Sequence, residues 1–342
     1  MSTIPIIDID VESDVGIWSQ ALAGRTRAAG QLVRALRREL EGATPRPLLA
    51  LLKAAVGALH AMFGHHYGDE VDELAALLGA SPAEIVLANI YYDLAAGGCS
   101  TFVQPAPAGP ILARSLDWNF SRQFLRKHTT VYRFLSAPCG PYATVSYPGL
   151  IGALTGMAPG RFAIAINYVR HATESGKAKI ASRGLKGYWP TTWVVRQALD
   201  HAATFADAVR HLSRTPLLAP VMFTVAGTAP GEGVVIERTP DRAVVRRMED
   251  DGAPVCLTNH YVSDDLIDSN EGIEEIDTVE RLDALERGLA DNVVHDAHAA
   301  LKLLSHKSLM SLITAHQVVA RPRDRMFVVR VPGQRAVTVD LG

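Results

Sequence analysis

The sequence has few cysteines, and this scarcity argues against two classes of protein. Only three occur in 342 residues, at Cys99, Cys139 and Cys256, and they form neither a CxxC pair nor a cluster with histidine. An odd number of widely spaced cysteines argues against a disulfide framework and against a structural zinc site. A large excess of charge of one sign is lacking as well. With a formal net charge of −2, nothing marks the chain for nucleic acid or for an anionic membrane.

Targeting and membrane-spanning signals are also missing. The first residues, MSTIPIIDIDVESD, contain no basic region followed by an apolar stretch, which argues against a signal peptide. No run reaches the roughly 18 unbroken apolar residues that a spanning helix needs. The longest candidate, residues 48–63, is interrupted by Lys53 and His60 and is typical of a buried or amphipathic helix. We therefore expect a cytoplasmic protein.

The residues before Cys99 predict a helical region. Apolar residues recur at helical spacing over 13–40, 47–63 and 69–78. A fourth helix is expected to begin at Ser81, because Ser81 can cap it, Pro82 suits the first helical position and Glu84 completes a capping box. The chain shows no internal repeat and no low-complexity segment.

The residues after Cys99 predict mostly strands. Segments 101–104 and 111–116 flank a Pro-Ala-Pro-Ala-Gly-Pro turn and are typical of a hairpin. Further strands are expected at 129–135, 143–147, 162–166, 221–226, 233–238, 243–248, 326–331 and 336–340, and helices near 192–201, 205–213 and 278–304. This order favours an α+β fold with two antiparallel sheets layered with helices over a βαβ repeat.

Cys99 stands where the helical region meets the first predicted strand, directly after Gly97 and Gly98. A cysteine nucleophile needs a base, and a newly freed α-amine, with a pKa of about 7.7–8.0, can serve as one. Glycines just upstream would let the backbone bend sharply, so that the thiol reaches the neighbouring peptide bond. The alternative is a buried structural cysteine, which is common.

Four segments around Cys99 carry a resemblance to a known family: Glu-Val-Asp-Glu-Leu at 70–74, Ala-Asn-Ile-Tyr-Tyr-Asp at 88–93, Cys-Ser-Thr at 99–101 and Ala-Arg-Ser-Leu-Asp-Trp at 113–118. They resemble the acid ceramidase and N-acylethanolamine acid amidase family, whose relatives include choloylglycine hydrolases and penicillin acyltransferases. Further similar segments are 147–152, 154–156, 217–221, 231–238 and Thr-Asn-His-Tyr at 258–261. The resemblance spans about residues 70–290.

The resemblance implies a four-layer αββα N-terminal-nucleophile (Ntn) hydrolase. Cleavage between Gly98 and Cys99 would divide the chain into a helical pro-segment, 1–98, and a catalytic domain, 99–342, and the two parts would stay associated. The implied activity is cleavage of a linear N-acyl amide, such as an N-acylethanolamine or a ceramide, by an amidohydrolase without a cofactor. Contact of the pro-segment with a lipid membrane remains open.

The resemblance also assigns roles to two charged residues of the predicted hairpin. Asp117 would bind and orient the freed α-amine; alternatively, it is a strand-end residue in a turn. Arg114 would lie beside the thiol and raise its thiolate fraction; alternatively, it is a solvated strand charge. Because Arg114 and Asp117 point to opposite faces of a strand, both reach Cys99 only if the strand twists, bulges or ends at Asp117.

Further site residues are expected downstream. Asn259 would donate to the tetrahedral oxyanion, although Asn after Thr is also common in turns. Asn167 would be a second donor or a substrate contact, and His260 and Trp118 would line the site. Arg281 would anchor the site, or it is a helix-surface residue that pairs with Asp277.

Two departures from the family pattern bear on these assignments. Arg114 follows Cys99 by 15 positions, one fewer than the family spacing, which a shortened hairpin would absorb. The segment after Asn259 lacks the Asp-Asp-Arg-Arg-Thr-Pro run of ceramidases, so Arg281 is the nearest candidate there. His295 and His298 are spaced for zinc on a predicted helix, but no third ligand is evident, so no metal site is expected.

Two other functions remain open. One is acyl transfer to an amine, as in penicillin acyltransferases, because the same thioester intermediate can react with either water or an amine. The other is a non-catalytic relative whose chain stays intact and whose Cys99 is structural.

Overall fold

The computed structural model describes residues 3–94, 97–118, 120, 122–171, 173–248, 253–271, 273, 277–291 and 294–341. The strands are β1 (Ile6–Ile9), β2 (Gly98–Gln104), β3 (Ile111–Asp117), β4 (Thr130–Phe134), β5 (Tyr142–Ser146), β6 (Thr155–Ala158), β7 (Phe162–Tyr168), β8 (Val221–Ala226), β9 (Gly233–Arg238), β10 (Ala243–Arg247), β11 (Val255–Leu257), β12 (Thr314–Arg321), β13 (Met326–Arg330) and β14 (Val337–Val339).

The helices are α1 (Ile17–Ala21), α2 (Thr26–Gly42), α3 (Arg46–Leu78), α4 (Pro82–Asn89), α5 (Tyr91–Leu94), α6 (Arg122–His128), α7 (Glu174–Leu185), α8 (Thr191–His201), α9 (Phe205–Arg214), α10 (Thr278–Asp291) and α11 (Ala297–Leu304), with short 3₁₀ turns at Ile267–Ser269 and Pro322–Asp324.

The strands form two sheets, which confirms the α+β class. One sheet has the order β1-β4-β5-β6-β7-β8-β9-β10, and the other has the order β11-β2-β3-β12-β13-β14. The described strand pairs are antiparallel except for β1 beside β4, a strand at the sheet edge that the sequence did not predict.

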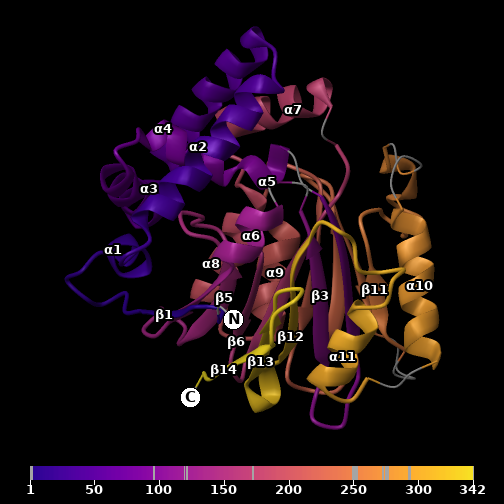
Figure 1. The fold of residues 1–342 in the computed structure, drawn as a ribbon. Coiled ribbons are helices and arrows are strands. Elements are labelled where there is room, and N and C mark those ends of the chain that lie inside the picture. Colours follow the sequence, from indigo (N-terminus) through magenta and orange to yellow (C-terminus); the bar gives the residue numbers. More distant parts are fainter. Residues whose placement is uncertain are drawn as a thin grey trace.

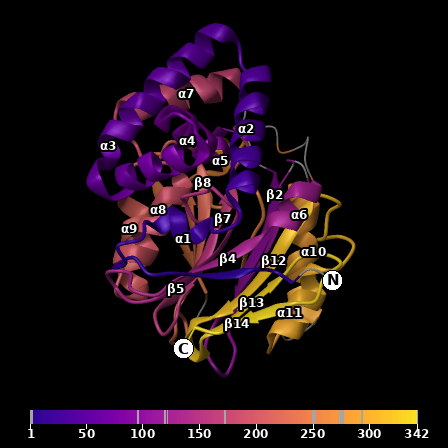
Figure 2. The same ribbon diagram turned by 60° about the vertical axis from the view of Figure 1, so that its left-hand side comes forward.

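The two sheets face each other, and helices cover their outer faces (Figures 1 and 2). A buried apolar cluster joins Val103, Leu112 and Val318 of the six-stranded sheet to residues of the eight-stranded sheet such as Val145 and Val235. A second cluster packs α10 and α11 against the six-stranded sheet, and a third packs α8 and α9 against the other sheet. Side chains of β2 and β3 are therefore buried on both faces.

The N-terminal helices α1 to α5 gather with α7 at one end of the sheets (Figures 1 and 2). The expected helix at 13–40 is two helices, α1 and α2. The two expected at 47–63 and 69–78 form α3, which is interrupted at Gly64 with φ 61°, a conformation that favours glycine. The predicted capping box of α4 is present: the Ser81 Oγ accepts from the Glu84 N–H, and the Glu84 carboxylate accepts from the Ser81 N–H.

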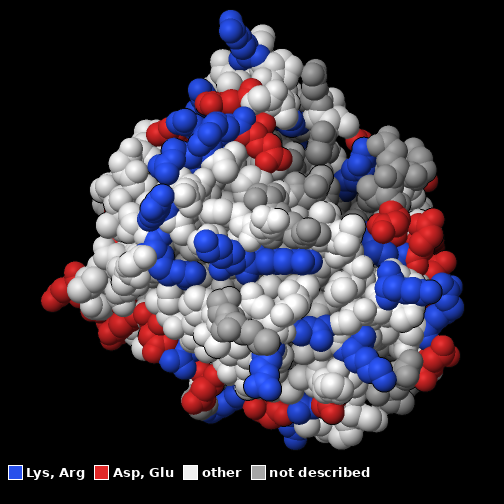
Figure 3. Space-filling view, viewed as in Figure 1, with Lys and Arg blue, Asp and Glu red and all other residues white. Residues whose placement is uncertain are grey.

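Part of α3, Arg46–His65, is long and apolar enough to cross a membrane by length and composition alone. Only 28% of its most apolar window is buried in the protein. On the face shown in Figure 3, Lys and Arg are interspersed with Asp and Glu, apart from a short row of basic side chains across the middle.

Downstream, the predicted β2–β3 hairpin is present, with an unbroken register from Gly98 opposite Asp117 to Gln104 opposite Ile111. The expected helix at 278–304 is instead α10 and α11, and Asp296 caps the second by accepting from the Ala299 N–H at 2.8 Å. The sequence did not predict β6, β11, β12, α6 or α7. Strand β12 matters most, because it lies beside β3 in the middle of its sheet.

Candidate functional site

Cys99 lies near the start of β2, and its side chain is 1% exposed. Its neighbour across the hairpin is Leu116, and Arg114 lies on the same face of β3 two residues earlier. The Arg114 Nη2 is 3.3 Å from the Cys99 Sγ. Arg114 also donates to the Thr155 Oγ1 at 2.7 Å and to the Ile166 carbonyl at 2.8 Å. Arg114 is fully buried, so the alternative of a solvated strand charge is wrong.

Asn259 holds the backbone N–H of Cys99, which belongs to the predicted scissile peptide bond. The Asn259 Oδ1 accepts from the Cys99 N at 2.8 Å and from the Arg281 Nη2 at 2.8 Å. The Asn259 Nδ2 donates to the Tyr168 carbonyl at 2.7 Å. The side-chain oxygen of Asn259 thus binds the N–H of the predicted scissile bond, and its side-chain nitrogen binds a carbonyl at the end of β7.

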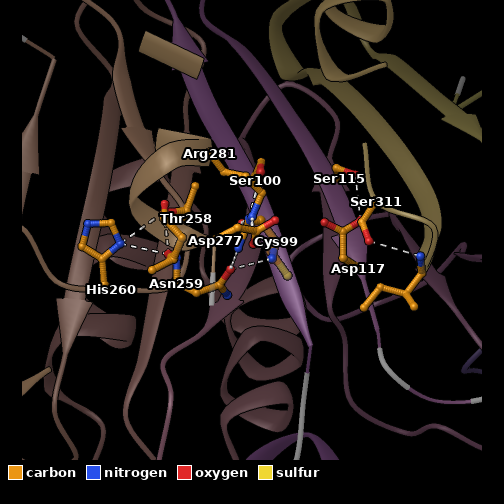
Figure 4. Close-up of polar contacts among 12 residues, drawn as sticks. Cys99, Ser100, Ser115, Asp117, Thr258, Asn259, His260, Asp277, Arg281 and Ser311 are labelled. Carbon is orange, nitrogen blue, oxygen red and sulfur yellow. Dashed lines mark hydrogen bonds and ion pairs between the residues drawn. The ribbon is translucent and has the colours of Figure 1, made fainter. Parts of the chain in front are cut away.

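Arg281 reaches the next peptide bond, between Cys99 and Ser100, from α10, and Figure 4 shows it beside these two residues. Its Nη1 donates to the Cys99 carbonyl at 2.7 Å and to the Ser100 Oγ at 3.1 Å. Its Nε donates to the Asp277 Oδ1 at 2.8 Å, so the expected helix pair exists together with the site contacts. A Cβ on Gly98 would lie 3.1 Å from the Arg281 Nη2, so the guanidinium packs directly against this glycine.

Asp117 ends β3 opposite Gly98 and is 2% exposed. Its carboxylate accepts from the Thr314 Oγ1 and, at 3.4 Å, from the Ser115 Oγ. Burial raises the pKa of Asp117, and these hydrogen bonds and the nearby arginines oppose that shift. Figure 4 shows Asp117 on the strand beside that of Cys99, close to Ser115.

Asn167 and His260 are buried near the site, and their described bonds go to other residues. Asn167 accepts from the Thr101 Oγ1 at 2.7 Å and donates to the Thr258 carbonyl at 2.8 Å. His260 lies on the far side of Asn259 from Cys99 (Figure 4), with its Nδ1 2.9 Å from the Thr278 Oγ1. Burial lowers the pKa of His260.

Trp118 belongs to an aromatic cluster that packs against the N-terminal helices. Its ring centroid lies 5.9 Å from that of Tyr92, 6.1 Å from that of Tyr91 and 5.7 Å from that of Tyr147. Trp118 and Tyr92 also line a small cavity with Asn89 and Leu154. The indole N–H of Trp118 has no partner among the described residues.

Three further residues of the site were not predicted from the sequence: two interact electrostatically with Cys99, and the third contacts one of these two. They are Tyr92 of α5, Tyr147, which follows β5, and His316 of β12. The His316 Nδ1 is 3.2 Å from the Tyr147 hydroxyl, and burial holds the pKa of His316 well below its usual value. Tyr92 and Tyr147 lie in segments that carry the family resemblance, so that resemblance could have identified them. His316 lies in a strand that was not predicted.

No group of three or more His, Cys, Asp or Glu residues that could hold a metal occurs in the described part of the chain. His295 precedes α11 and His298 lies within it, so the two do not share a helix.

Comparisons with known proteins agree with this geometry. Residues 107–321 match the model of the family described as "Acyl-coenzyme A:6-aminopenicillanic acid acyl-transferase". The mouse N-acylethanolamine-hydrolyzing acid amidase is 31% identical over 195 residues, covering 57% of this chain and 53% of the relative. Mouse acid ceramidase is 26% identical over 239 residues, covering 65% and 60%. The chain thus spans about half the length of the amidases it matches.

The fold has a solved counterpart in the N-acylethanolamine-hydrolyzing acid amidase ortholog of Caenorhabditis elegans. The TM-score is 0.56 at 22% identity, over 71% of this chain and 100% of the other. The match to the family model, residues 107–321, lies after Cys99. The chain belongs to the acyl-coenzyme A:6-aminopenicillanic acid acyl-transferase family and is related to N-acylethanolamine acid amidases and acid ceramidases.

Proposed function

We propose that this protein is a cysteine Ntn amidohydrolase that cleaves itself between Gly98 and Cys99 and then hydrolyses linear N-acyl amides. The observation that carries the proposal is the convergence on Cys99 of three side chains from different elements. Arg114 contacts the thiol, Asn259 binds the backbone N–H of Cys99 and Arg281 binds the backbone carbonyl of Cys99. On this proposal residues 1–98 form the pro-segment, and 99–342 form an αββα catalytic domain.

Self-cleavage would begin with attack of the Cys99 thiolate on the Gly98 carbonyl carbon. The C–N bond then breaks, the nitrogen takes up a proton and becomes the α-amine of Cys99, and Gly98 is left as a thioester on the sulfur. Water hydrolyses the thioester to a Gly98 carboxylate and a free thiol. Arg114 favours the thiolate, and Asn259 and Arg281 hold the N–H and the carbonyl of Cys99, on the C-terminal side of the bond.

In the processed enzyme the α-amine would take the proton from the thiol as the sulfur attacks the substrate carbonyl. The Asn259 Nδ2 is the proposed donor to the tetrahedral oxyanion, once it exchanges its bond to the Tyr168 carbonyl for one to substrate. The α-amine then passes this proton to the substrate nitrogen, which leaves as the free amine, and water releases the acid from the thioester. Asp117, opposite Gly98, would bind the α-amine; because a carboxylate favours the protonated amine, its main task is orientation.

The proposed substrates are fatty-acyl amides such as N-acylethanolamines or ceramides. Support comes from the activities that the names of the relatives state, "N-acylethanolamine-hydrolyzing acid amidase" and "Acid ceramidase". The family description instead supports acyl transfer as the second candidate. The two reactions share the thioester and differ in whether water or an amine reaches it.

The pro-segment is proposed to stay bound after cleavage. Glu70 of α3 forms a buried, bidentate ion pair with Arg196 of α8, at 2.7 and 2.8 Å. Trp18 donates to the same carboxylate at 3.0 Å, and the Tyr67 hydroxyl donates to Asp200 at 2.8 Å. The contacts of Glu70 with Arg196 and of Tyr67 with Asp200 join 1–98 to 99–342, while the bond from Trp18 lies within 1–98. We refer to these five residues as the buried clasp.

Contact with lipid is the final part of the proposal. The stretch Arg46–His65 of α3 is strongly apolar and mostly unburied, and Leu51 is 38% exposed. Leu185 at the end of α7, which packs against α3, is 49% exposed. Co-sedimentation with phosphatidylcholine vesicles should be weakened by Leu51→Glu with Leu185→Glu; equal binding by the double variant and the wild type would remove this part of the proposal.

Self-cleavage is tested by intact mass and a denaturing gel. Wild type should yield the fragments 1–98 and 99–342, and Cys99→Ala should stay whole. If the wild type remains whole from mild acid to neutral pH, exactly as Cys99→Ala does, the self-processing proposal is wrong.

The reaction is tested on the processed protein with N-acyl amides that vary in head group and chain length. Release of the free amine and acid supports hydrolysis, whereas appearance of a new amide when a second amine is added supports acyl transfer. If processed protein shows neither reaction above the Cys99→Ala background, the enzyme proposal is wrong.

A further inference from the structure

Tyr92 is held rigidly on the N-terminal side of the cleavage point. It lies on α5 and is 3% exposed. Its ring packs edge-on against Trp118, at 5.9 Å and 86°, and against Tyr168, at 6.4 Å and 85°. Two aromatic contacts at nearly right angles fix the plane of the ring and therefore the direction of the hydroxyl.

The hydroxyl of Tyr92 points at the group of atoms that surrounds the nucleophile. It lies 3.3 Å from the Ile166 carbonyl oxygen, which also accepts from the Arg114 Nη2 at 2.8 Å. That same Nη2 is 3.3 Å from the Cys99 Sγ. The phenol and the guanidinium therefore share one carbonyl oxygen, and the same guanidinium nitrogen contacts the thiol.

The bond from Tyr92 to Ile166 is weak, because O–H···O bonds usually measure 2.5–3.0 Å. The hydroxyl is also near enough to the Cys99 side chain for the two groups to interact electrostatically. Burial and the proximity of Cys99 hold the pKa of Tyr92 well above its usual value, so the phenol stays protonated. A neutral phenol donates more strongly to a thiolate than to a thiol, since charge-assisted hydrogen bonds are about twice as strong.

We propose that Tyr92 is a positioning residue for the Cys99 thiolate, so that the pro-segment supplies part of the nucleophile's surroundings before and after cleavage. This inference rests on the proposed function, which makes Cys99 the nucleophile, but its test, alkylation of Cys99, requires no catalytic activity. It explains why the pro-segment would need to stay bound: without Tyr92 the thiolate would keep Arg114 and lose a second donor.

The other titratable or charged groups described near the thiol and the Tyr92 hydroxyl come from five elements or their ends. They are Asp93 of α5, Arg114 and Asp117 of β3, Tyr147 after β5, His316 of β12 and Arg281 of α10. His316 is uncharged because burial lowers its pKa so far, and Tyr147 is uncharged because burial raises its pKa. Replacing Tyr92 leaves all of these in place.

The adjacent Tyr91 provides a matched control. It is as buried as Tyr92, lies on the same helix and also packs against Trp118. Its hydroxyl, however, donates to the Glu39 carboxylate at 2.6 Å, within the pro-segment. Each Tyr→Phe change deletes one oxygen and keeps the ring, so the packing is preserved in both variants.

The experiment measures alkylation of Cys99 by iodoacetamide against pH, with the product located by peptide mass. It is run on the wild type, Tyr92→Phe and Tyr91→Phe, in their processed form and again as full-length chains. Tyr92→Phe should move the acid limb of the rate profile up by about one pH unit, a tenfold loss of thiolate at acid pH. Tyr91→Phe should leave the profile unchanged.

The measurement separates this inference from the proposed function. A wild-type profile for Tyr92→Phe overturns the inference, as does an equal shift in Tyr91→Phe or a uniform fall in rate without a shift. If Tyr92→Phe is not processed, its full-length chain gives the profile, because alkylation requires no turnover. Failure of every chain to cleave or to release amine counts against the proposed function and leaves the profile comparison intact.

Discussion

At the scale of single residues, the site depends on one close contact between backbone and guanidinium. Arg281 bridges the carbonyl of Cys99, the Asn259 amide and Asp277, and it does so while packed against Gly98. Because Gly98 has no Cβ, the guanidinium can lie directly beside the scissile bond. The glycine that the sequence analysis interpreted as a source of backbone freedom is thus also needed for space.

Gly98→Ala should slow self-cleavage by at least tenfold, because its Cβ would lie 3.1 Å from the Arg281 Nη2 and displace that side chain. The measurement is the rate of appearance of fragment 99–342 on a denaturing gel. Gly57→Ala is the control, since a Cβ there meets nothing within 4 Å. Wild-type cleavage by Gly98→Ala would show that this contact does not matter.

Asn259→Asp should separate the two roles proposed for that side chain. An aspartate keeps an acceptor for the Cys99 N–H and Arg281, so self-cleavage should persist. It lacks the Nδ2 donor, so amide hydrolysis should fall by about 10²–10³ in kcat. Gel and amine-release assays on the same preparation check this, with Asn259→Ala expected to lose both; equal activity of Asn259→Asp and wild type would exclude the oxyanion role.

At the scale of elements, α5 links the proposed pro-segment to the part of the chain that follows Cys99. Asp93 on α5 accepts from the Thr191 N–H at 3.0 Å, at the first residue of α8. Its backbone carbonyl accepts from the His171 Nε2 at 2.6 Å, beyond the end of β7. The short helix that carries Tyr92 is therefore anchored to elements that flank the site.

Asp93→Asn should flatten the pH dependence of stability. Burial raises the pKa of Asp93 to about 7, against about 3.9 for a free aspartate. The folded chain then binds this proton more tightly than the unfolded chain, so the stabilisation is complete below pH 4 and is lost as the pH rises towards 7. Asparagine keeps the acceptor and has no proton to lose.

The measurement is Tm between pH 4 and 7.5 in the Cys99→Ala background, which prevents cleavage. Asp296→Asn, at the exposed cap of α11, is the control and should keep the original slope. An unchanged slope in Asp93→Asn would mean that another group carries the pH dependence.

At the scale of the whole molecule, the buried clasp decides whether the two parts separate. Arg196 is 2% exposed and Glu70 is 4% exposed, so neither charge can be solvated if its partner is removed. Breaking such a pair costs about 3–5 kcal/mol, while replacing both members by apolar residues is often close to neutral.

Arg196→Met should therefore release fragment 1–98 from 99–342 after cleavage, as measured by size-exclusion chromatography. Glu70→Met with Arg196→Met should hold the fragments together better than either single change. Arg210→Gln, which breaks the exposed pair with Asp207, should cost at most about 1 kcal/mol and leave the complex intact. Retention of the pro-segment by Arg196→Met would mean that other contacts hold the parts together. The cytoplasmic location stays a prediction.

Much of the secondary structure of this protein can be predicted from local patterns in its sequence. Strand segments such as 221–226 and 233–238, the Ser81 capping box and the β2–β3 hairpin were predicted, because each is determined by residues close in sequence. The resemblance likewise predicted Cys99, Arg114, Asn259 and Arg281 as site residues, and the structure brings these four residues into contact with one another.

Tertiary structure decided the rest. Strand β12 carries the buried polar residues Thr314, His316 and Gln317, which interrupt the apolar pattern that would predict a strand. Its position between β3 and β13 stabilises it. No local pattern predicts that α10 places Arg281 on Gly98, that Tyr92 of α5 binds the Ile166 carbonyl, or that Glu70 pairs with Arg196. These contacts join residues far apart in the chain, and their partners are set by how the layers pack.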